Sequence, residues 1–305
     1  MYKIIENDPF FEDIKTQEAR DNLDSLVNYL CSSPVPKEKK RDPQRDKIII
    51  EDEILIDGNY EIEHLSFANA FYNPQNLKLI NEVLRNRTAY NSVDSLDPYL
   101  IYGFSYIYHL DKEKIVELGT MKFYSSVAIM EHELIHTLMA LNNNNPQPQH
   151  AEILSIFGEL LSLITFSQKN DNPIIYENAL INKCITRMYC RFFTSEFSDE
   201  YIKMQRERNI RSGLRNTYPY ISQYPYMLGF IYASRLLNIY RNNPSDVLSK
   251  VNDILSGKSN VDDLLSDYNI SLTDKNTCED FISLCDQYRD ILKRRYSSSQ
   301  LHSMK

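Results

Sequence analysis

The chain has 305 residues, of which 42% are hydrophobic and 25% are charged, and its net charge is −8. This is the composition of an ordinary globular protein, and the length fits one large domain or two closely packed ones. The acidic balance excludes the basic surface that nucleic-acid binding requires, so we expect no nucleic-acid partner. Only seven glycines are present, which argues against an all-β protein rich in tight turns.

No segment of the chain suggests export or a membrane span. The first residues, MYKIIENDPFFEDI, lack the apolar core of a signal peptide. No run approaches about 18 uninterrupted apolar residues. The five cysteines are scattered without C-x-x-C spacing, which fits a reducing compartment where thiols serve as small apolar residues. We therefore expect a cytoplasmic protein with no membrane partner.

The first part of the chain is expected to form two helices and two pairs of strands. Helical spacing of apolar residues, or their alternation with acidic residues, predicts each of them. The helices cover 11–31 and 74–86, and the strand pairs lie within 48–64 and within 99–120. Asp57-Gly58 is a hairpin turn signal in the first pair, and the second pair turns at 111–113.

One strand of the second pair is expected to bind an extended peptide along the edge of the sheet. Strand addition of this kind holds the main chain of a peptide without reading much of its sequence. The segment 101–109 or the segment 114–119 would supply the edge. The alternative is a hairpin with a structural role alone.

Residues 121–168 carry the strongest chemical signal in the chain. They predict two helices joined by an Asn/Pro-rich turn, and the first helix contains H-E-L-I-H. His132 and His136 are four residues apart, so they share one helical face and can bind one metal ion. Zinc accepts neutral His nitrogens, and Glu133 can act as general base on a metal-bound water. The alternative is a chance copy of this motif on an ordinary amphipathic helix.

A catalytic zinc ion needs a third protein ligand, and Glu152 at the start of the second helix is our choice. A short turn can bring the start of this helix against the first one. Ser155 and Glu159 follow on the face of Glu152, where they can hydrogen-bond the ligands and fix their orientation. His150 either packs on the turn or competes as a ligand.

The sequence H-E-L-I-H followed by A-E-I-L-S-I-F-G-E-L-L resembles the thimet oligopeptidase and oligoendopeptidase F family of zinc metallopeptidases. In that family a second helix reads E-x-x-S-x-x-x-E, and its first Glu is the third zinc ligand. Glu152, Ser155 and Glu159 match this pattern position by position. The resemblance covers residues from about 121 to 240. It implies one Zn²⁺ per chain and a hydrolase that cleaves short peptides.

After residue 168 the pattern is almost wholly helical, and one segment is rich in tyrosine. The family has a helix of the kind Y-x-Y-A-x-G-x-x-x-A at a similar place, and Tyr224, Tyr226, Gly229 and Ala233 match its spacing. The resemblance implies that a hydroxyl from this region binds the carbonyl oxygen as negative charge develops on it. We favour Tyr224 or Tyr226 as this catalytic group, and stacked core tyrosines are the alternative. Two further candidates, ranked behind them, are Tyr218 and Tyr220.

The chain departs from the family in several respects, and the turn between its two predicted zinc helices is shorter than usual. The chain is much shorter than most members, Ile135 stands where the family commonly has Gly, and no His occurs between residues 151 and 301 to match the family's His beside the tyrosines. These departures motivate an alternative from another class. In it the chain is a catalytically inactive, zinc-binding relative that serves as a peptide-binding or partner-binding module.

We therefore predict a mainly α protein with a small antiparallel β-sheet (α+β) and a zincin-like catalytic core. Residues 1–120 would form an N-terminal helix and sheet region, and residues 121–305 a helical zinc-peptidase core, together one compact unit. The expected function is that of a zinc metalloendopeptidase or oligopeptidase, with a peptide as substrate and no cofactor besides zinc. His132, His136 and Glu152 would hold the metal, and Glu133 would be the general base.

Overall fold

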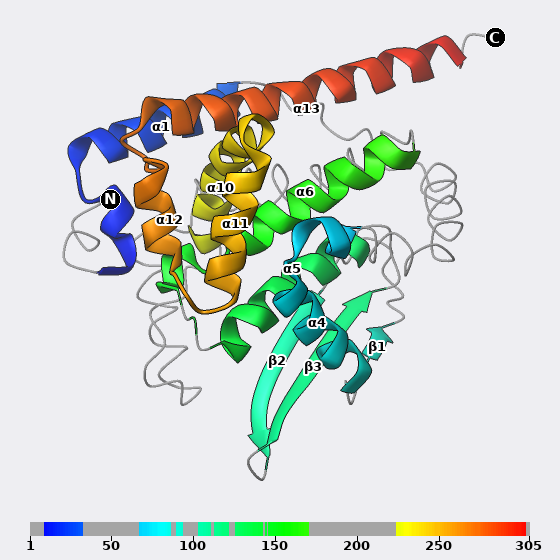
Figure 1. Ribbon diagram of the computed structural model, residues 1–305. Helices are drawn as coiled ribbons and strands as arrows, with labels where there is room; N and C mark the ends of the chain where they lie inside the picture. The colour runs from blue at the N-terminus through cyan, green and yellow to red at the C-terminus, as the bar shows by residue number, and fades with distance from the viewer. Residues whose placement is uncertain are drawn as a thin grey trace, which may run out of the picture.

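The computed structural model describes residues 9–32, 67–86, 90–93, 103–110, 113–121, 126–142, 144, 146–170 and 224–302. Most of these residues are helical, so the predicted mainly α class is confirmed. A small sheet extends from one end of the helical body (Figure 1). None of the described helices is both long enough and apolar enough to cross a membrane. The strand pair predicted within 48–64 lies outside the described residues.

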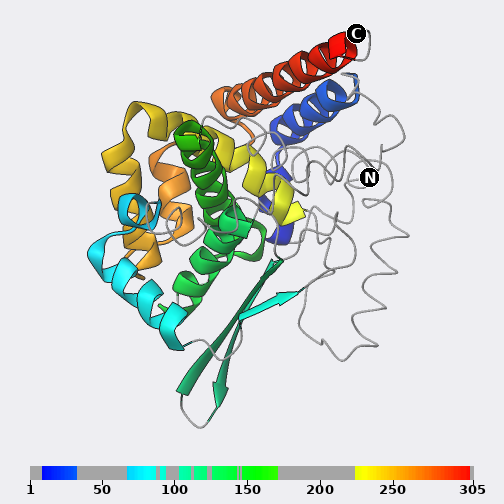
Figure 2. The same cartoon turned by 90° about the vertical axis from the view of Figure 1, so that its right-hand side faces the viewer.

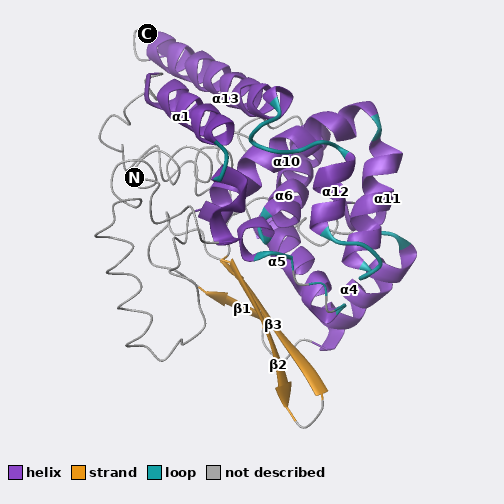
Figure 3. Cartoon of the chain, turned by 90° about the vertical axis from the view of Figure 1, so that its left-hand side faces the viewer, coloured by secondary structure: helices purple, strands orange, loops and turns teal. Residues whose placement is uncertain are grey.

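The N-terminal helical region is broken in two, where the sequence predicted one helix over 11–31. A 3-10 helix, η2 (Pro9–Ile14), precedes the α-helix α1 (Gln17–Ser32). The break falls at Thr16, because its hydroxyl accepts a hydrogen bond from the amide of Ala19 at 3.1 Å and so caps the start of α1. Figures 2 and 3 show α1 lying alongside the long C-terminal helix α13 (Lys275–His302).

The sheet has three strands in the order β1-β3-β2. β2 (Gly103–Leu110) and β3 (Glu113–Met121) pair antiparallel, with Leu110 opposite Glu113 at one end of the ladder. β1 (Tyr90–Val93) pairs with β3 in parallel, so the sheet is mixed and the prediction of a wholly antiparallel sheet is wrong. The sequence of β1, YNSV, has no alternation of apolar and polar residues and so carries no strand signal.

The strand order distinguishes the two segments considered for peptide binding. The segment 101–109 overlaps β2, which is the outer strand on its side of the described sheet. The segment 114–119 lies in β3, which has a partner on each side. Both strands contact α5 (Ser126–Leu141), the helix that carries H-E-L-I-H. The outer strand therefore lies beside the helix with the candidate ligands.

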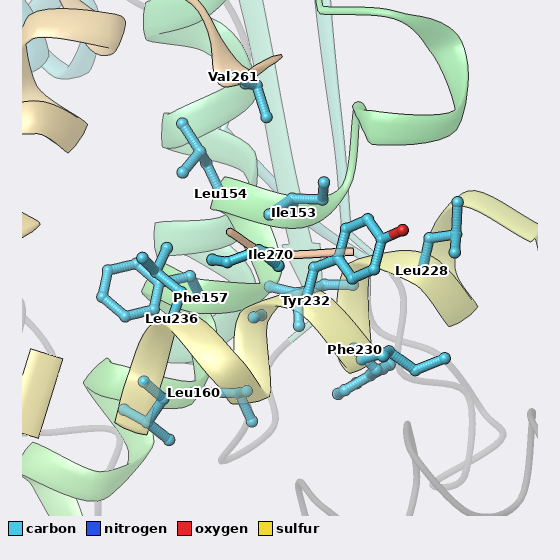
Figure 4. Packing of buried hydrophobic residues seen from close by; sticks show 14 of the residues in the cluster. Ile153, Leu154, Phe157, Leu160, Leu228, Phe230, Tyr232, Leu236, Val261 and Ile270 are labelled. Atoms are coloured by element: carbon cyan, nitrogen blue, oxygen red, sulfur yellow. The ribbon is translucent and has the colours of Figure 1, made fainter. Parts of the chain in front are cut away.

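Three helices form the centre of the molecule. α6 (Ile153–Asn170) packs against α5 on one side and against α10 (Tyr224–Asn242) on the other. Its residues from Ile153 to Ser162 are all buried, as expected for a helix that is apolar nearly all round. The short 3-10 helix η4 (Pro148–His150) leads into α6. Figure 4 shows the contact of α6 with α10, made by Ile153, Leu154, Phe157 and Leu160 with Leu228, Tyr232 and Leu236.

Helices α4 (Pro74–Asn86), α11 (Pro244–Leu255) and α12 (Val261–Asp267) complete the described body. α4 and α11 each begin at a proline, whose fixed φ suits the first helical position, and both match the sequence prediction. The buried side chain of Asn252 connects α11 to the start of α4. Its oxygen accepts hydrogen bonds from the amide of Asn73 at 2.7 Å and from Nδ2 of Asn76 at 3.0 Å. Its nitrogen donates to the carbonyl of Phe71 at 2.8 Å.

We expect Asn252→Ala to lower the free energy of unfolding by about 2–4 kcal/mol, since it leaves the buried groups bonded to Asn252 without partners. Urea unfolding followed by circular dichroism measures the effect. The matched control is Asn242→Ala, whose exposed amide bonds only a carbonyl one turn back in α10. The control should change the free energy of unfolding by less than about 0.5 kcal/mol. Equal effects of the two substitutions would contradict the role of Asn252.

Candidate metal centre

Helix α5 presents His132 and His136 on one face. Leu134 and Leu138 are buried at 0% and 1% exposure and hold the opposite side of the helix in the core. The two imidazole rings lie one turn apart, with their centroids 4.8 Å from each other. His132 is 3% exposed, whereas the side chain of His136 is 24% exposed, so the centre opens to solvent at His136.

Ile135, which replaces the family's Gly, is accommodated by a glycine on the neighbouring helix. A Cβ placed on Gly158 of α6 would collide with Cδ1 of Ile135. The isoleucine side chain therefore fills the space that a side chain at position 158 would otherwise occupy. This exchange of volumes lets α5 and α6 approach closely at the level of the two His residues.

Glu152 brings a carboxylate oxygen to both imidazoles. Nε2 of His132 lies 3.2 Å from Nε2 of His136, and Oε2 of Glu152 lies 3.1 Å and 3.3 Å from these nitrogens. Ligand atoms held about 2.0–2.1 Å from a tetrahedral zinc ion lie about 3.3 Å apart. The three atoms, which we call the ligand triangle, thus match one face of a zinc tetrahedron. No fourth His, Cys, Asp or Glu among the described residues joins this group.

The chemistry of these groups also suits a divalent cation. Burial on its own would raise the pKa of Glu152, but positive charge on His136 and hydrogen bonds from both imidazoles hold the pKa well below its usual range. The carboxylate is therefore ionised at neutral pH, which is the form that ligates a metal. Two imidazoles and one carboxylate are a ligand set found in catalytic zinc sites. The residues present fit zinc.

Glu159 and Ser155 both lie next to the ligands. Oε2 of Glu159 is 3.2 Å from Nδ1 of His132, the ring nitrogen that does not belong to the ligand triangle. A carboxylate on that nitrogen fixes the tautomer and the orientation of a metal-binding imidazole. The hydroxyl of Ser155 donates to the backbone carbonyl of Glu152 at 3.0 Å and lies 3.4 Å from its Oε2. Ser155 thus contacts the main chain of Glu152 more closely than its carboxylate.

The two glutamates that flank His132 have different surroundings. Glu131 is fully buried and accepts a hydrogen bond from the hydroxyl of Tyr72 at 2.9 Å. Burial and the Glu131 carboxylate both raise the pKa of Tyr72, so the phenol keeps its proton and remains a donor. Glu133 is partly exposed on the next position of the helix. The sequence gives no sign of the Tyr72–Glu131 pair, because the two residues meet only through tertiary packing.

Of the two favoured tyrosines, Tyr226 lies against the candidate ligand His132. Its ring is stacked on that of His132, with the centroids 6.4 Å apart and the planes 8° from parallel. Tyr224 is fully buried and packs against Phe11 of η2 at 5.0 Å. Burial, and to a smaller extent the carboxylate of Asp13, raise the pKa of Tyr224. Tyr218 and Tyr220 lie outside the described residues.

His150 is bound by two aspartates and does not belong to the ligand triangle. Its Nε2 lies 3.0 Å from Oδ2 of Asp13, and its Nδ1 lies 2.7 Å from Oδ1 of Asp262. Burial disfavours the charged ring, but the hydrogen bonds and charges of the two carboxylates outweigh burial and raise the pKa of His150. The geometry agrees with the reading in which His150 packs on the turn. Asp13 was missed by sequence reasoning because no local pattern connects it to residue 150.

We expect the wild-type protein to bind one zinc ion per chain. Glu152→Ala should contain much less than one zinc ion per chain, because two imidazoles alone bind the metal too weakly to retain it. Glu159→Gln should keep one zinc ion but bind it about 10–100-fold more weakly, as is typical for partners of ligating histidines. Elemental analysis gives the stoichiometry, and competition with a chromogenic chelator gives the affinity. Glu279→Gln, on the exposed surface of α13, is the control. Full zinc content in Glu152→Ala would contradict the choice of third ligand.

Comparisons of the chain with protein-family models, with curated proteins and with solved structures find no match.

Proposed function

We propose that this chain is a zinc-dependent metallopeptidase that hydrolyses peptide bonds of short peptides. The observation that carries the proposal is the ligand triangle of His132, His136 and Glu152, to which the described residues add no fourth protein ligand, with Glu133 beside its first member. Structural zinc sites are closed by four protein ligands, whereas hydrolytic sites have three and keep one position for water or substrate. The arrangement therefore favours catalysis over a structural role.

A zinc ion in this centre would act as a Lewis acid that makes water acidic near neutral pH and polarises a carbonyl group. The protein residues supply the remaining steps. Glu133 takes a proton from the attacking water and then gives it to the leaving nitrogen of the peptide bond. Its partial exposure suits this role, since the carboxylate has to reach both water and substrate. Glu159 keeps the His132 ring turned so that Nε2 points at the centre.

The hydroxyl of Tyr226 is the proposed donor to the carbonyl oxygen as it becomes negative. The stacking of Tyr226 on His132 supports this role because it places the Tyr226 ring next to the ligand triangle, with its centroid 6.4 Å from that of the His132 ring. A phenol that donates to an oxyanion lowers the barrier only if it is fixed before the reaction begins. The contact with His132 provides such a fixed position.

Short peptides are the proposed substrates, bound in extended form along β2. The outer position of β2 in the described sheet and its contact with α5 support this placement. A peptide added to that strand would lie beside the helix that carries His132 and Glu133. Main-chain hydrogen bonds would then hold the substrate with little dependence on its sequence.

We expect Glu133→Gln to lower kcat for a fluorogenic peptide by about 10²–10⁴-fold, because the amide cannot act as a general base. The zinc content of this variant should equal that of the wild type, since Glu133 is not a ligand. Glu279→Gln again serves as the control and should keep full activity.

Wild-type activity that survives in Glu133→Gln would contradict the proposed mechanism. If the zinc-loaded wild type binds peptides without cleaving them, the function is that of the binding module. The absence of a His between residues 151 and 301 favours that second candidate. In that case the wild type and Glu133→Gln should bind a peptide with the same dissociation constant, and neither should cleave it.

We expect Tyr226→Phe to lower kcat by about 10²–10³-fold, because removing one donor to an oxyanion has an effect of this size. KM should change little, since the donor acts mainly on the transition state. Tyr224→Phe is the matched comparison and should leave kcat within about threefold, because its ring packs against Phe11. Steady-state kinetics of the two variants on one peptide make the test. Equal losses in both would contradict the assignment to Tyr226.

A further inference from the structure

A polar cluster surrounds His150, two residues before the third ligand. The hydroxyl of Tyr232 donates to Oδ1 of Asp13, and the other carboxylate oxygen of Asp13 faces Nε2 of His150. Nδ1 of His150 faces Asp262. Elements from four parts of the chain, namely η2, η4, α10 and α12, therefore meet at one imidazole.

Most of this cluster is withdrawn from water. Tyr232 is 0% exposed, His150 is 8% exposed and the side chain of Asp13 is 10% exposed. Removing ionisable groups from water costs free energy even when they are paired, and in some proteins such groups fix a unique arrangement of the chain. The proposed reaction needs no proton from them, because none belongs to the ligand triangle. Their contribution is thus to the geometry of the turn that contains His150.

Glu152 lies in the segment between η4 and α6, where regular secondary structure does not fix the backbone. α6 begins at Ile153, and the carbonyl of Glu152 accepts the first hydrogen bond of this helix from the amide of Ile156 at 2.9 Å. The amides at a helix start have no partners within the helix, so the helix alone does not fix the backbone that precedes it. Anchoring His150 anchors the chain immediately before the ligand.

Helix α10 supports the same region at three points on successive turns. The ring of Tyr226 stacks on His132, and Tyr232 bonds Asp13. Between them, a Cβ on Gly229 would lie only 3.1 Å from Cβ of Glu152. Residues three apart on a helix face similar directions, so one side of α10 borders the first ligand, the third ligand and the cluster.

We propose that Asp13 is a positioning residue for the metal centre. Oriented by Tyr232, its carboxylate holds His150, and Asp262 secures the other nitrogen of the same ring. The anchored imidazole fixes the backbone of the segment before Glu152, and this fixes the position from which Glu152 reaches the two His ligands. Asp13 touches neither metal nor substrate. The inference rests on the proposed function in that it takes Glu152 to be a zinc ligand.

The test measures zinc affinity in Asp13→Asn, which keeps the shape of the side chain and removes its charge. The dissociation constant for Zn²⁺, from competition with a chromogenic chelator, should rise about tenfold, at the lower end of the range for residues that support metal ligands. Tyr232→Phe removes only a hydroxyl and should raise the constant by roughly threefold. If Asp13→Asn does not fold, Tyr232→Phe decides the question.

A second tyrosine–aspartate pair offers a matched control. The hydroxyl of Tyr268 donates to Oδ2 of Asp246 at 2.6 Å, a bond of the same type between α11 and the end of α12. Asp246→Asn and Tyr268→Phe should leave the dissociation constant for Zn²⁺ unchanged. These two variants measure how the loss of a tyrosine–aspartate hydrogen bond affects stability at a place that does not support a proposed zinc ligand.

Melting temperatures with and without Zn²⁺, and the absorption spectrum of the Co²⁺-loaded protein, separate positioning from stability. The inference requires that Asp13→Asn reduces the rise in melting temperature caused by Zn²⁺ and alters the Co²⁺ spectrum. An equal drop in the melting temperature of the metal-free and zinc-loaded forms, with an unchanged dissociation constant, would overturn it. If the wild-type protein binds no zinc, the proposed metal centre itself is wrong. Elemental analysis of the wild type shows this before any variant is compared.

Discussion

The close contact of α5 with α6 is the constraint on which the rest of the centre depends. Ile135 occupies the space beside Gly158, and Glu159 is the next residue along α6. Glu152 and Glu159 both lie on or next to α6, and both contact the ring of His132 on α5. These two contacts require that α5 and α6 pack closely together. A side chain at position 158 would have to displace the end of the Ile135 side chain, which is buried between the two helices.

Electrostatics adds a second reason for a cation at this place. Four carboxylates, Glu131, Glu133, Glu152 and Glu159, lie on or next to the turns that carry the two imidazoles. Glu131 accepts a hydrogen bond from Tyr72, and Glu159 faces the outer nitrogen of His132. Among the described residues, these four carboxylates outnumber the two imidazoles of the ligand triangle. A dication reduces that imbalance, and its binding is stabilised by charges that do not touch it.

The sequence predicts the local parts of this structure well and the non-local parts poorly. The helices 74–86 and 244–255 and the antiparallel pairing of β2 with β3 follow from periodicity and from proline at the helix starts. The approach of Glu152 to His132 and His136 follows from motif spacing once a helical hairpin is assumed.

What spacing cannot give is the set of contacts made by residues far apart in sequence. β1 lacks a strand pattern, and its parallel pairing depends on the path of the chain. The choice between Tyr224 and Tyr226 depends on the rotation of α10, which an almost wholly buried helix does not reveal in its sequence. Asp13 could be assigned to His150 only after η2 had been placed beside η4.

The polar cluster around His150 also bears on the order of events during synthesis. The three proposed ligands are close together in sequence, whereas the groups around His150 come from residues 13, 232 and 262. A ribosome exposes the ligands well before α10 and α12 have emerged, so a nascent chain would hold metal only loosely. Firm retention of the ion would begin after the last third of the polypeptide has folded onto the first helices. In the proposed zinc centre, metal loading would therefore be a late step of folding.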